Sequence, residues 1–350
     1  MKNILPKRLT IYDLAEKTGV SIATVSRVIN NAPNVNEHTR LKILKLLDAT
    51  SYKPKVVKNR LPCIGVLLEA EGLGINLFND YNAAILSGVS DYVFKHGLAL
   101  SIFPFSSKAI KHPDDLMRHL QERGIDGVVV IYRKNYDKCL SSLHANMFPH
   151  FSIGGGRGVT PFSISYEEEK AVEMAIDHFI ELGHKRIGFV STDSDNDSPK
   201  RRIKAFRKLT KSKDCIAIDD LILKKQYHTS HKRLGYETIM NFKDSILENP
   251  PDALLCTDVN IAVGVLKAFD EVHIAVPDDI SVIGFNNSEF SEYTNPSLSV
   301  VSHPFYEMGL YAAENIFCRL NGGQVSQSEK LFNPDLILRK SCGAAKRGGK

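Results

Sequence analysis

The sequence contains no tryptophan and no long run of apolar residues. A helix that crosses a membrane needs about 20 consecutive apolar residues, so we expect no membrane span. The opening residues, MKNILPKRLT, lack the apolar core of a secretory signal peptide. Together these absences predict a cytoplasmic protein.

The signatures of metal, redox and enzyme sites are also missing. The six cysteines are scattered and none belongs to a C-x-x-C pair, which fits reduced thiols better than a disulfide framework or a zinc site. There is no G-x-S-x-G motif. The glycine loop at 154–158 lacks the Gly-Lys-Ser/Thr ending of a phosphate-binding loop. We therefore expect no cofactor, no metal ion and no enzymatic activity.

Positive charge is concentrated at one end of the chain. Residues 1–62 hold twelve Lys and Arg against four Asp and Glu, a net charge of +8. Because the whole chain carries +5, the remainder carries −3. A basic head on a mildly acidic body favours a polyanionic partner held by that head. The alternative is a basic surface that only faces solvent.

Residues 10–30, TIYDLAEKTGVSIATVSRVIN, have the pattern of two short helices joined by a tight turn. Thr10 and Ser21 are candidate N-caps, and Gly19 permits the backbone turn that ends the first helix. The second helix is expected to bury Ala23, Val25, Val28 and Ile29 and to expose Thr24, Ser26, Arg27 and Asn30. Such a polar exposed face suits a DNA major groove, where Arg binds guanine through two hydrogen bonds. The alternative is a capped helical hairpin with a solvated face.

A third helix is expected to follow and to complete a small headpiece. Asn36 is its candidate cap, and it should run to about residue 49. Its apolar residues are expected to point inward: Leu41, Ile43, Leu44 and Leu47.

From Cys63 onward the pattern alternates between strands and helices. Strands are predicted at 63–70, 98–105, 126–132, 150–156, 185–190, 252–257 and 280–285. Helices are predicted at 80–95, 113–123, 168–182, 199–210, 231–248 and 258–270. Near-continuous apolar strands such as CIGVLLEA are typical of parallel sheets covered on both faces. Two successive runs of this kind predict two doubly wound lobes with a ligand site beyond the carboxyl ends of their strands.

These blocks resemble the LacI/GalR (lactose-repressor) family of bacterial transcriptional regulators. VSIATVSRVIN, preceded by IYDLAEKTG, closely matches the family's DNA-binding headpiece, and GHKRI and VPDDISVIGF match blocks of its body. The resemblance covers about residues 8–343 and implies a small all-α helix-turn-helix headpiece joined to an α/β two-lobed, periplasmic-binding-protein-like domain. The implied segments are a headpiece at 1–50, a hinge at 51–62, an N-lobe at 63–161 and 293–324, a C-lobe at 162–292 and 325–342, and a basic tail at 343–350.

The resemblance also implies a hinge helix that inserts a leucine into the DNA minor groove. Leu61 stands at the position of that leucine, but Lys55 and Lys58 replace the family's usual Asn and Ala. The linker is also shorter than is usual. Two interpretations therefore stay open: Leu61 inserts, or the linker is a tether whose lysines follow phosphates.

Five residues match effector contacts of the family. Tyr81 lies in an N-D-Y sequence that matches N-P-F/Y, where the ring stacks on the effector, and Arg202 lies in R-I-K-A-F, which matches R-x-x-G-F. Packing at a helix start is the alternative for Tyr81, and Arg201 or a solvated face is the alternative for Arg202. The remaining candidates are Asp258, Asn286, which stands where Asp is usual, and Tyr166.

The sequence as a whole predicts a homodimeric, ligand-controlled transcriptional regulator, most simply a repressor. Arg27 is expected to contact a base edge, Thr24, Ser26 and the headpiece lysines to position the helix on phosphates, and Ile22 and Ala23 to tune base preference. The predicted DNA-binding set also includes Thr10, Ser21 and Asn30. A two-fold dimer requires a pseudo-palindromic double-stranded operator. The expected effector is a small polar molecule, by family likeness a sugar or derivative. The alternative is a two-lobed solute-binding protein, which would lack the basic headpiece.

Overall fold

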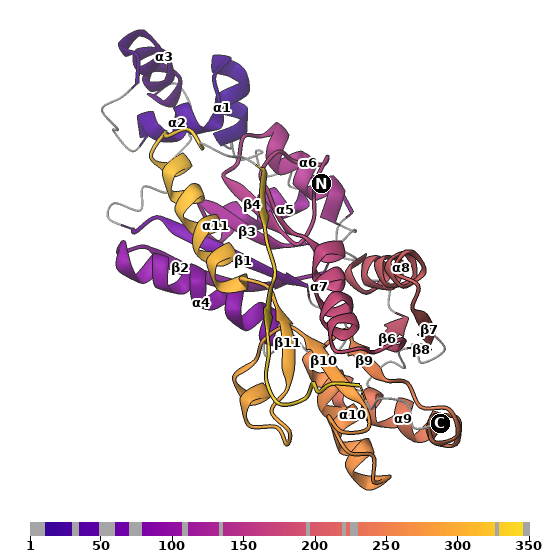
Figure 1. The fold of residues 1–350 in the computed structure, drawn as a ribbon. Helices are drawn as coiled ribbons and strands as arrows, with labels where there is room; N and C mark the ends of the chain where they lie inside the picture. Colours follow the sequence, from indigo (N-terminus) through magenta and orange to yellow (C-terminus); the bar gives the residue numbers. More distant parts are fainter. Residues whose placement is uncertain are drawn as a thin grey trace, which may run out of the picture. The chain divides into compact units, whose positions relative to one another are not determined.

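The computed structural model describes residues 11–29, 35–48, 60–69, 79–106, 111–132, 136–193, 197–218, 222–224, 230–325 and 329–345. The chain divides into two compact units, residues 1–62 and 63–350, and each is described by itself (Figure 1). Some of the residues that the sequence predicts to contact DNA lie outside the described ranges: Thr10, Asn30, Lys55 and Lys58.

The first unit contains three short helices: α1 (Ile11–Thr18), α2 (Ile22–Ile29) and α3 (Glu37–Asp48). The predicted caps are present at α2 and α3. The Thr24 amide donates to Ser21 Oγ at 3.2 Å, and the His38 amide donates to Asn36 Oδ1 at 3.0 Å. Gly19, with φ at +69°, makes the turn between α1 and α2 in a conformation that L side chains rarely adopt. The local sequence signals therefore fix where α2 begins and how it leaves α1.

A core of five buried residues holds the three helices together. They are Leu14, Ala15, Val25, Val28 and Ile43. The prediction was wrong for three apolar residues, since Ala23, Leu41 and Leu44 are exposed. A helix advances 100° per residue, so the stripe centred on Ile43 leaves Leu44 and Leu41 at its flank and back. The same geometry places Ala23 opposite Val25 and Val28 on α2.

The second unit is built on two sheets. The first has the strand order β12-β5-β4-β3-β1-β2, and all its neighbouring strands are parallel. Its strands are β1 (Cys63–Glu69), β2 (Ala99–Phe105), β3 (Gly127–Ile131), β4 (His150–Ile153), β5 (Ser163–Tyr166) and β12 (Glu329–Phe332). Its helices are α4 (Asp80–Lys95), α5 (Asp115–Glu122), α6 (Asp137–Ala145) and α11 (Phe305–Leu320). Every residue of β3 is buried, so both faces of this sheet are covered.

The second sheet has the order β13-β11-β10-β9-β6-β7, with β8 pairing to β6. Its pairs are parallel except β11 with β13. Its strands are β6 (Arg186–Asp193), β7 (Ile216–Ile218), β8 (Ile222–Lys224), β9 (Ala253–Cys256), β10 (Ser281–Phe285), β11 (Ser299–Ser302) and β13 (Asp335–Ile337). Its helices are α7 (Glu168–Glu181), α8 (Asp197–Ser212), α9 (His231–Glu248), α10 (Val259–Glu271) and the 3-10 helix η3 (Glu289–Glu292).

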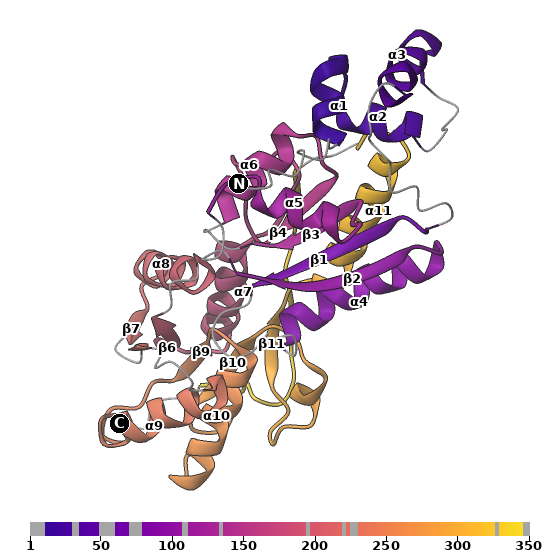
Figure 2. The same ribbon diagram turned by 180° about the vertical axis from the view of Figure 1, so that it is seen from behind.

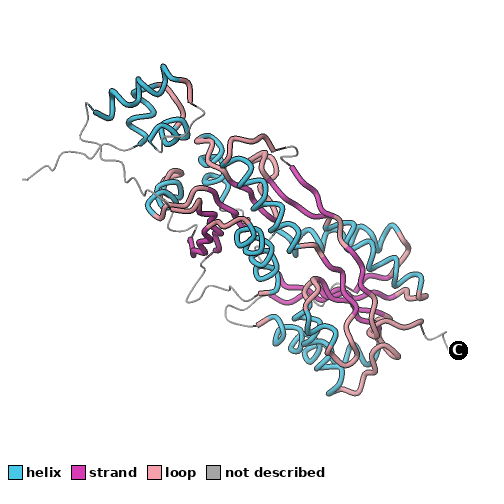
Figure 3. The backbone as a smooth tube through the Cα atoms, turned by 90° about the vertical axis from the view of Figure 1, so that its left-hand side faces the viewer, coloured by secondary structure: helices cyan, strands magenta, loops and turns pink. Residues whose placement is uncertain are grey.

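Alternate residues of the second sheet point to opposite helical layers. On β9, Leu254 packs in a core with α9 and α10, whereas Leu255 packs in a core with α7 and α8. Figure 2 shows the ribbon from behind, and Figure 3 shows strands lying between helices. The prediction of two doubly wound α/β lobes is confirmed, because strands and helices alternate along both halves of this unit and form two separate sheets.

Two helix pairs approach each other closely through glycine. A Cβ added at Gly309 of α11 would lie 2.2 Å from the Ile85 carbonyl oxygen of α4, and one at Gly264 of α10 would lie 1.9 Å from the Lys232 oxygen of α9. No side chain fits at those distances, so each lobe uses a glycine to bring two helix backbones together.

The chain exchanges between the sheets later than the predicted lobe limits. β5 and β12 belong to the first sheet and β11 to the second, although the limits at 162, 293 and 325 assigned each of them to the other lobe. The exchanges therefore follow Tyr166, Ser302 and Phe332. Each of these strands is only four residues long, too short for its own pattern to favour one sheet, so the pairing partner decides.

Candidate functional site

The exposed side of α2 carries the residues that the sequence predicts for DNA contact. Ala23 and Arg27 are exposed, and Ile22, Thr24 and Ser26 are half-buried. The hydroxyls of Ser21 and Thr24 lie 2.9 Å apart and are hydrogen-bonded to each other, and Ser21 Oγ also caps the helix by accepting from the Thr24 amide. Arg27 thus projects a planar donor group from a short, capped helix, which is the geometry that reads a base edge.

A lysine of α3 holds the end of α1 in place. Lys42 Nζ donates to the Thr18 carbonyl at 2.9 Å, and Thr18 Oγ1 donates back to the Leu14 carbonyl at 2.6 Å. The lysine bond satisfies a carbonyl that a helix end leaves unpaired. Leu61 of the linker is 57% exposed, and residues 60–62 are not helical. Its side chain is therefore available for an apolar contact in this unit.

In the second unit, polar side chains follow three neighbouring strands where each strand ends. Asp258 comes two residues after β9, Asn286 directly after β10 and His303 directly after β11. Because these strands are parallel neighbours, their carboxyl ends share one edge of the sheet. Ligands of doubly wound folds bind at this edge.

Aromatic rings connect this edge to the first sheet. Tyr81 of α4 meets Phe305 edge to face with centroids 4.6 Å apart, and Phe305 lies 5.5 Å from Tyr166. The Tyr166 ring lies 4.3 Å from that of His303. Burial raises the pKa of Tyr166 to about 12, so its hydroxyl stays protonated. The two predicted aromatic residues therefore belong to one cluster, although they come from different elements.

Arg202 of α8 contacts the protein interior through each of its three guanidinium nitrogens. Its Nε donates to Glu168 Oε2 at 2.5 Å, and its Nη1 donates to the Thr257 carbonyl at 2.7 Å. Its Nη2 lies 3.3 Å from His303 Nε2, and the guanidinium covers the Phe285 ring at 4.1 Å. The side chain is 4% exposed. The structure thus assigns a buried environment to Arg202, whereas its neighbour Arg201 is exposed.

Glu168 and His303 are site residues that the sequence analysis missed. Glu168 is the first residue of α7 and is buried, and it also accepts a hydrogen bond from Ser198 Oγ. Burial and the Arg202 charge keep the pKa of His303 well below its ordinary value, so the ring is neutral. Their positions just after β5 and β11 are a usable signal, since carboxyl-end residues of both strands face the ligand region.

Two atoms at this edge are buried and unsatisfied. Among the residues that the structure describes, His303 Nδ1 and Asn286 Oδ1 have no hydrogen-bond partner. Asn286 adopts a φ of +69°, a conformation that Asn tolerates better than most residues. Buried polar atoms are normally hydrogen-bonded, so these two indicate where a ligand would supply partners.

Asp258 caps α10 as well as lying at the strand edge. Its carboxylate accepts from the Asn260 amide at 2.7 Å and lies 3.4 Å from His231 Nδ1. Burial acts to raise the pKa of Asp258, but the His231 and Asn260 contacts outweigh it and lower the pKa. Burial raises the pKa of Asp80, which also interacts with Asp258. Because Asp80 begins α4, two carboxylates from the two lobes lie near each other here, and their like charges repel.

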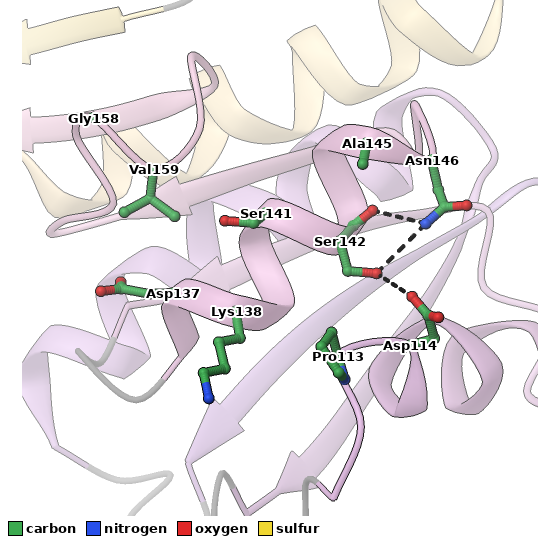
Figure 4. Close-up of a pocket in the computed structure, with 10 residues that line it drawn as sticks. All are labelled: Pro113, Asp114, Asp137, Lys138, Ser141, Ser142, Ala145, Asn146, Gly158 and Val159. Atoms are coloured by element: carbon green, nitrogen blue, oxygen red, sulfur yellow. Dashed lines mark hydrogen bonds between the residues drawn. The ribbon is translucent and has the colours of Figure 1, made fainter.

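The described part of the body also holds a histidine after a helix end and a surface pocket. His184 lies in a turn and bonds to Ser281 Oγ at 2.9 Å. A pocket of about 580 Å³ opens between α5 and α6, and it is lined by residues such as Asp114, Ser142 and Asn146 (Figure 4). Within the described part of the chain, no three His, Cys, Asp or Glu side chains are placed to hold a metal ion. No described helix is long and apolar enough to cross a membrane.

Comparisons with known proteins agree with both units. A family model described as bacterial regulatory proteins, lacI family, matches residues 10–55, and one described as a periplasmic binding protein-like domain matches residues 176–342. The chain is 28% identical over 340 residues to the HTH-type transcriptional repressor PurR of Photobacterium profundum, covering 95% of this chain and 98% of that protein. It is 29% identical over 343 residues to the HTH-type transcriptional regulator RegA of Clostridium saccharobutylicum, with the same coverage.

The fold is also that of a solved regulator. The lac repressor dimer bound to operator and the anti-inducer ONPF superposes with a TM-score of 0.67 and 22% identity, covering 97% of this chain and 100% of that one. The headpiece match, the body match and the relatives along nearly the whole length agree with one another. The chain belongs to the lacI family of bacterial regulatory proteins.

Proposed function

We propose that this protein is a transcriptional repressor that binds a pseudo-palindromic operator as a homodimer and responds to a small polar ligand. The observation that carries the proposal is the exposed face of α2, where Arg27 projects from a capped helix in a unit of strongly positive charge. Two such helices related by a two-fold axis would read two half-sites in successive major grooves. Membership of the lacI family supports the same role.

The proposed ligand site lies at the carboxyl edge of the second sheet, where Asp258, Asn286 and His303 meet the Tyr81 and Tyr166 aromatic cluster. Carboxylate and amide oxygens bind hydroxyl groups, and aromatic rings cover the apolar faces of a sugar. A sugar or sugar derivative therefore matches the chemistry of these side chains. Because the chain passes three times between the sheets, a ligand held by both lobes would change their relative placement and so the affinity for operator.

A binding assay on selected DNA tests the repressor role. The full chain would select operators from a random double-stranded library, and fluorescence anisotropy would give Kd at several salt concentrations. R27A should weaken binding to the selected operator by about 1–3 kcal/mol and relax the preference at one base pair in each half-site. K45A, which removes an exposed charge from α3, should weaken all sequences alike.

The assay also decides against the alternative. A solute-binding protein without a DNA role would show no sequence-selective binding, and its residual DNA affinity would not distinguish R27A from K45A. An R27A variant that kept full selectivity would show that α2 does not read bases.

A further inference from the structure

We propose that Glu168 makes the ligand site reject anions, so that the effector is an uncharged molecule rich in hydroxyl groups. This inference rests on the proposed function, because it concerns the same ligand site. It adds that the ligand is uncharged and that Glu168 determines this specificity.

The first step is the state of Arg202, the only strongly basic side chain buried among the described residues of this edge. All three of its nitrogens already contact the protein, through Glu168, the Thr257 carbonyl and His303. One face of its planar group is covered by Phe285 at 4.1 Å. A guanidinium that binds a carboxylate or phosphate through two parallel bonds must present two free N–H groups at one edge. Three of the five N–H groups of Arg202 are engaged in these contacts, so at most two remain for an anion.

The ion pair of Glu168 and Arg202 carries no net charge. Glu168 is buried with Arg202, and its other oxygen bonds to Ser198. Its negative charge therefore cancels the positive charge of Arg202 where the dielectric is low and the cancellation matters most. Arg201 lies 3.9 Å from Glu168, but its side chain is half exposed and its field is screened by water. An anionic ligand would meet a site with little net positive charge.

His303, Asn286 and Asp258 provide the polar groups that a ligand can bind at this edge. His303 Nε2 faces an Arg202 donor, so the single proton of this neutral ring lies on Nδ1. Nδ1–H is then a buried, uncharged donor, and Asn286 Oδ1 is a buried acceptor. The Asp258 carboxylate adds an acceptor that carries negative charge. One neutral donor and several acceptors suit hydroxyl groups, which both donate and accept, and disfavour carboxylates, which only accept.

The test uses matched neutral and anionic sugars on the full chain. The probes are D-glucose with D-gluconate and glucose 6-phosphate, D-galactose with D-galacturonate, and D-ribose with ribose 5-phosphate. Thermal shift would rank them and calorimetry would give Kd. In the wild-type protein the neutral member of a pair should bind more tightly than its anionic partner. E168Q should free the Arg202 charge and improve binding of an anionic member by roughly tenfold or more, about 1.4 kcal/mol.

Two controls tie the gain to this ion pair. E169Q changes the neighbouring, exposed glutamate that pairs with Lys208, and it should leave the charge preference as in wild type. The double variant E168Q/R202M lacks the guanidinium, so the anion gain should disappear. Circular dichroism before each titration would confirm that each variant is folded.

The outcomes separate this inference from the broader proposal. The proposed rejection of anions by Glu168 would be overturned by either of two results: an anionic sugar that binds the wild-type protein more tightly than its neutral partner, or an E168Q variant with no gain for anions. Either result would leave the repressor role standing. If the protein bound the selected operator but neither neutral nor anionic sugars, and E168Q did not improve anion binding, both the proposed role of Glu168 and the carbohydrate assignment would be contradicted. Loss of selective DNA binding would refute the repressor role by itself.

Discussion

The buried ion pair makes a quantitative prediction about stability. R202M removes the guanidinium from Glu168, from the Thr257 carbonyl and from the face of Phe285. The methionine fills most of the volume, so the cost comes mainly from leaving the Glu168 carboxylate buried without its partner. Breaking a buried ion pair from one side costs about 3–5 kcal/mol. Since whole proteins are stable by only about 5–15 kcal/mol, this loss should be visible at once.

The double variant E168Q/R202M separates the charge effect from the packing effect. With both charges gone, the desolvation penalty disappears as well as the attraction, and the losses that remain are the donors to the Thr257 carbonyl and to His303 Nε2. An unsatisfied buried acceptor costs about 1–3 kcal/mol. The double variant should therefore recover at least about 2 kcal/mol relative to R202M, so the two substitutions are strongly non-additive.

Urea unfolding provides the measurement. The chain has no tryptophan, so far-ultraviolet circular dichroism is the natural probe. Because the chain forms two units, the transition of the larger unit must be fitted separately from that of the headpiece. If R202M lost less than about 1 kcal/mol, or if the double variant were less stable than both single variants, the pair would not be a buried, mutually dependent contact.

Two further predictions concern the lobe that contains the first sheet. G309A should destabilise the protein by about 1–3 kcal/mol, since its Cβ would lie 2.2 Å from the Ile85 oxygen and force α4 and α11 apart; a thermal melt that rises would refute this contact. Burial lowers the pKa of His150 to about 4, so the unfolded chain binds a proton that the folded chain excludes. Stability should fall as the pH drops from about 6.5 to about 4, by about 2 kcal/mol at pH 5 from this group alone. In H150N the fall in the urea midpoint between pH 7 and pH 5 should be smaller than in wild type, because this group no longer contributes. An unchanged fall would show that His150 titrates normally.

Local signals in the sequence predicted the elements well. The helix predicted at 80–95 is α4 with those bounds, and its cap is Asn79, whose Oδ1 accepts from the Asn82 amide at 2.7 Å. Capping and periodicity act over four or five residues, so they can be read from the chain directly. The αL turn at Gly19 belongs to the same class of local signal.

Features that depend on tertiary pairing could not be read in this way. The exchange points after Tyr166, Ser302 and Phe332 depend on which sheet accepts a short strand. The partner of Arg202 depends on how α7 packs beside α8, and nothing in the run of glutamates at 167–169 marks Glu168 as the buried one. The DNA contacts of α2 and the ligand contacts at the sheet edge stay predictions, because these roles depend on binding to DNA and to a ligand.

The late strand exchanges have a consequence for how the protein is made. β12 forms one border of the first sheet and β13 one border of the second, and both come from residues 329–337. Beyond them, Ser341 ties β10 to β11 by accepting from the Ser299 amide at 2.8 Å and donating to the Val282 carbonyl at 2.6 Å. A ribosome that has released everything up to residue 328 therefore holds two unfinished sheets, with β5 and β11 open to pairing with other chains. Both borders are completed by residues 329–337, and a nonsense codon before residue 329 would leave both sheets incomplete.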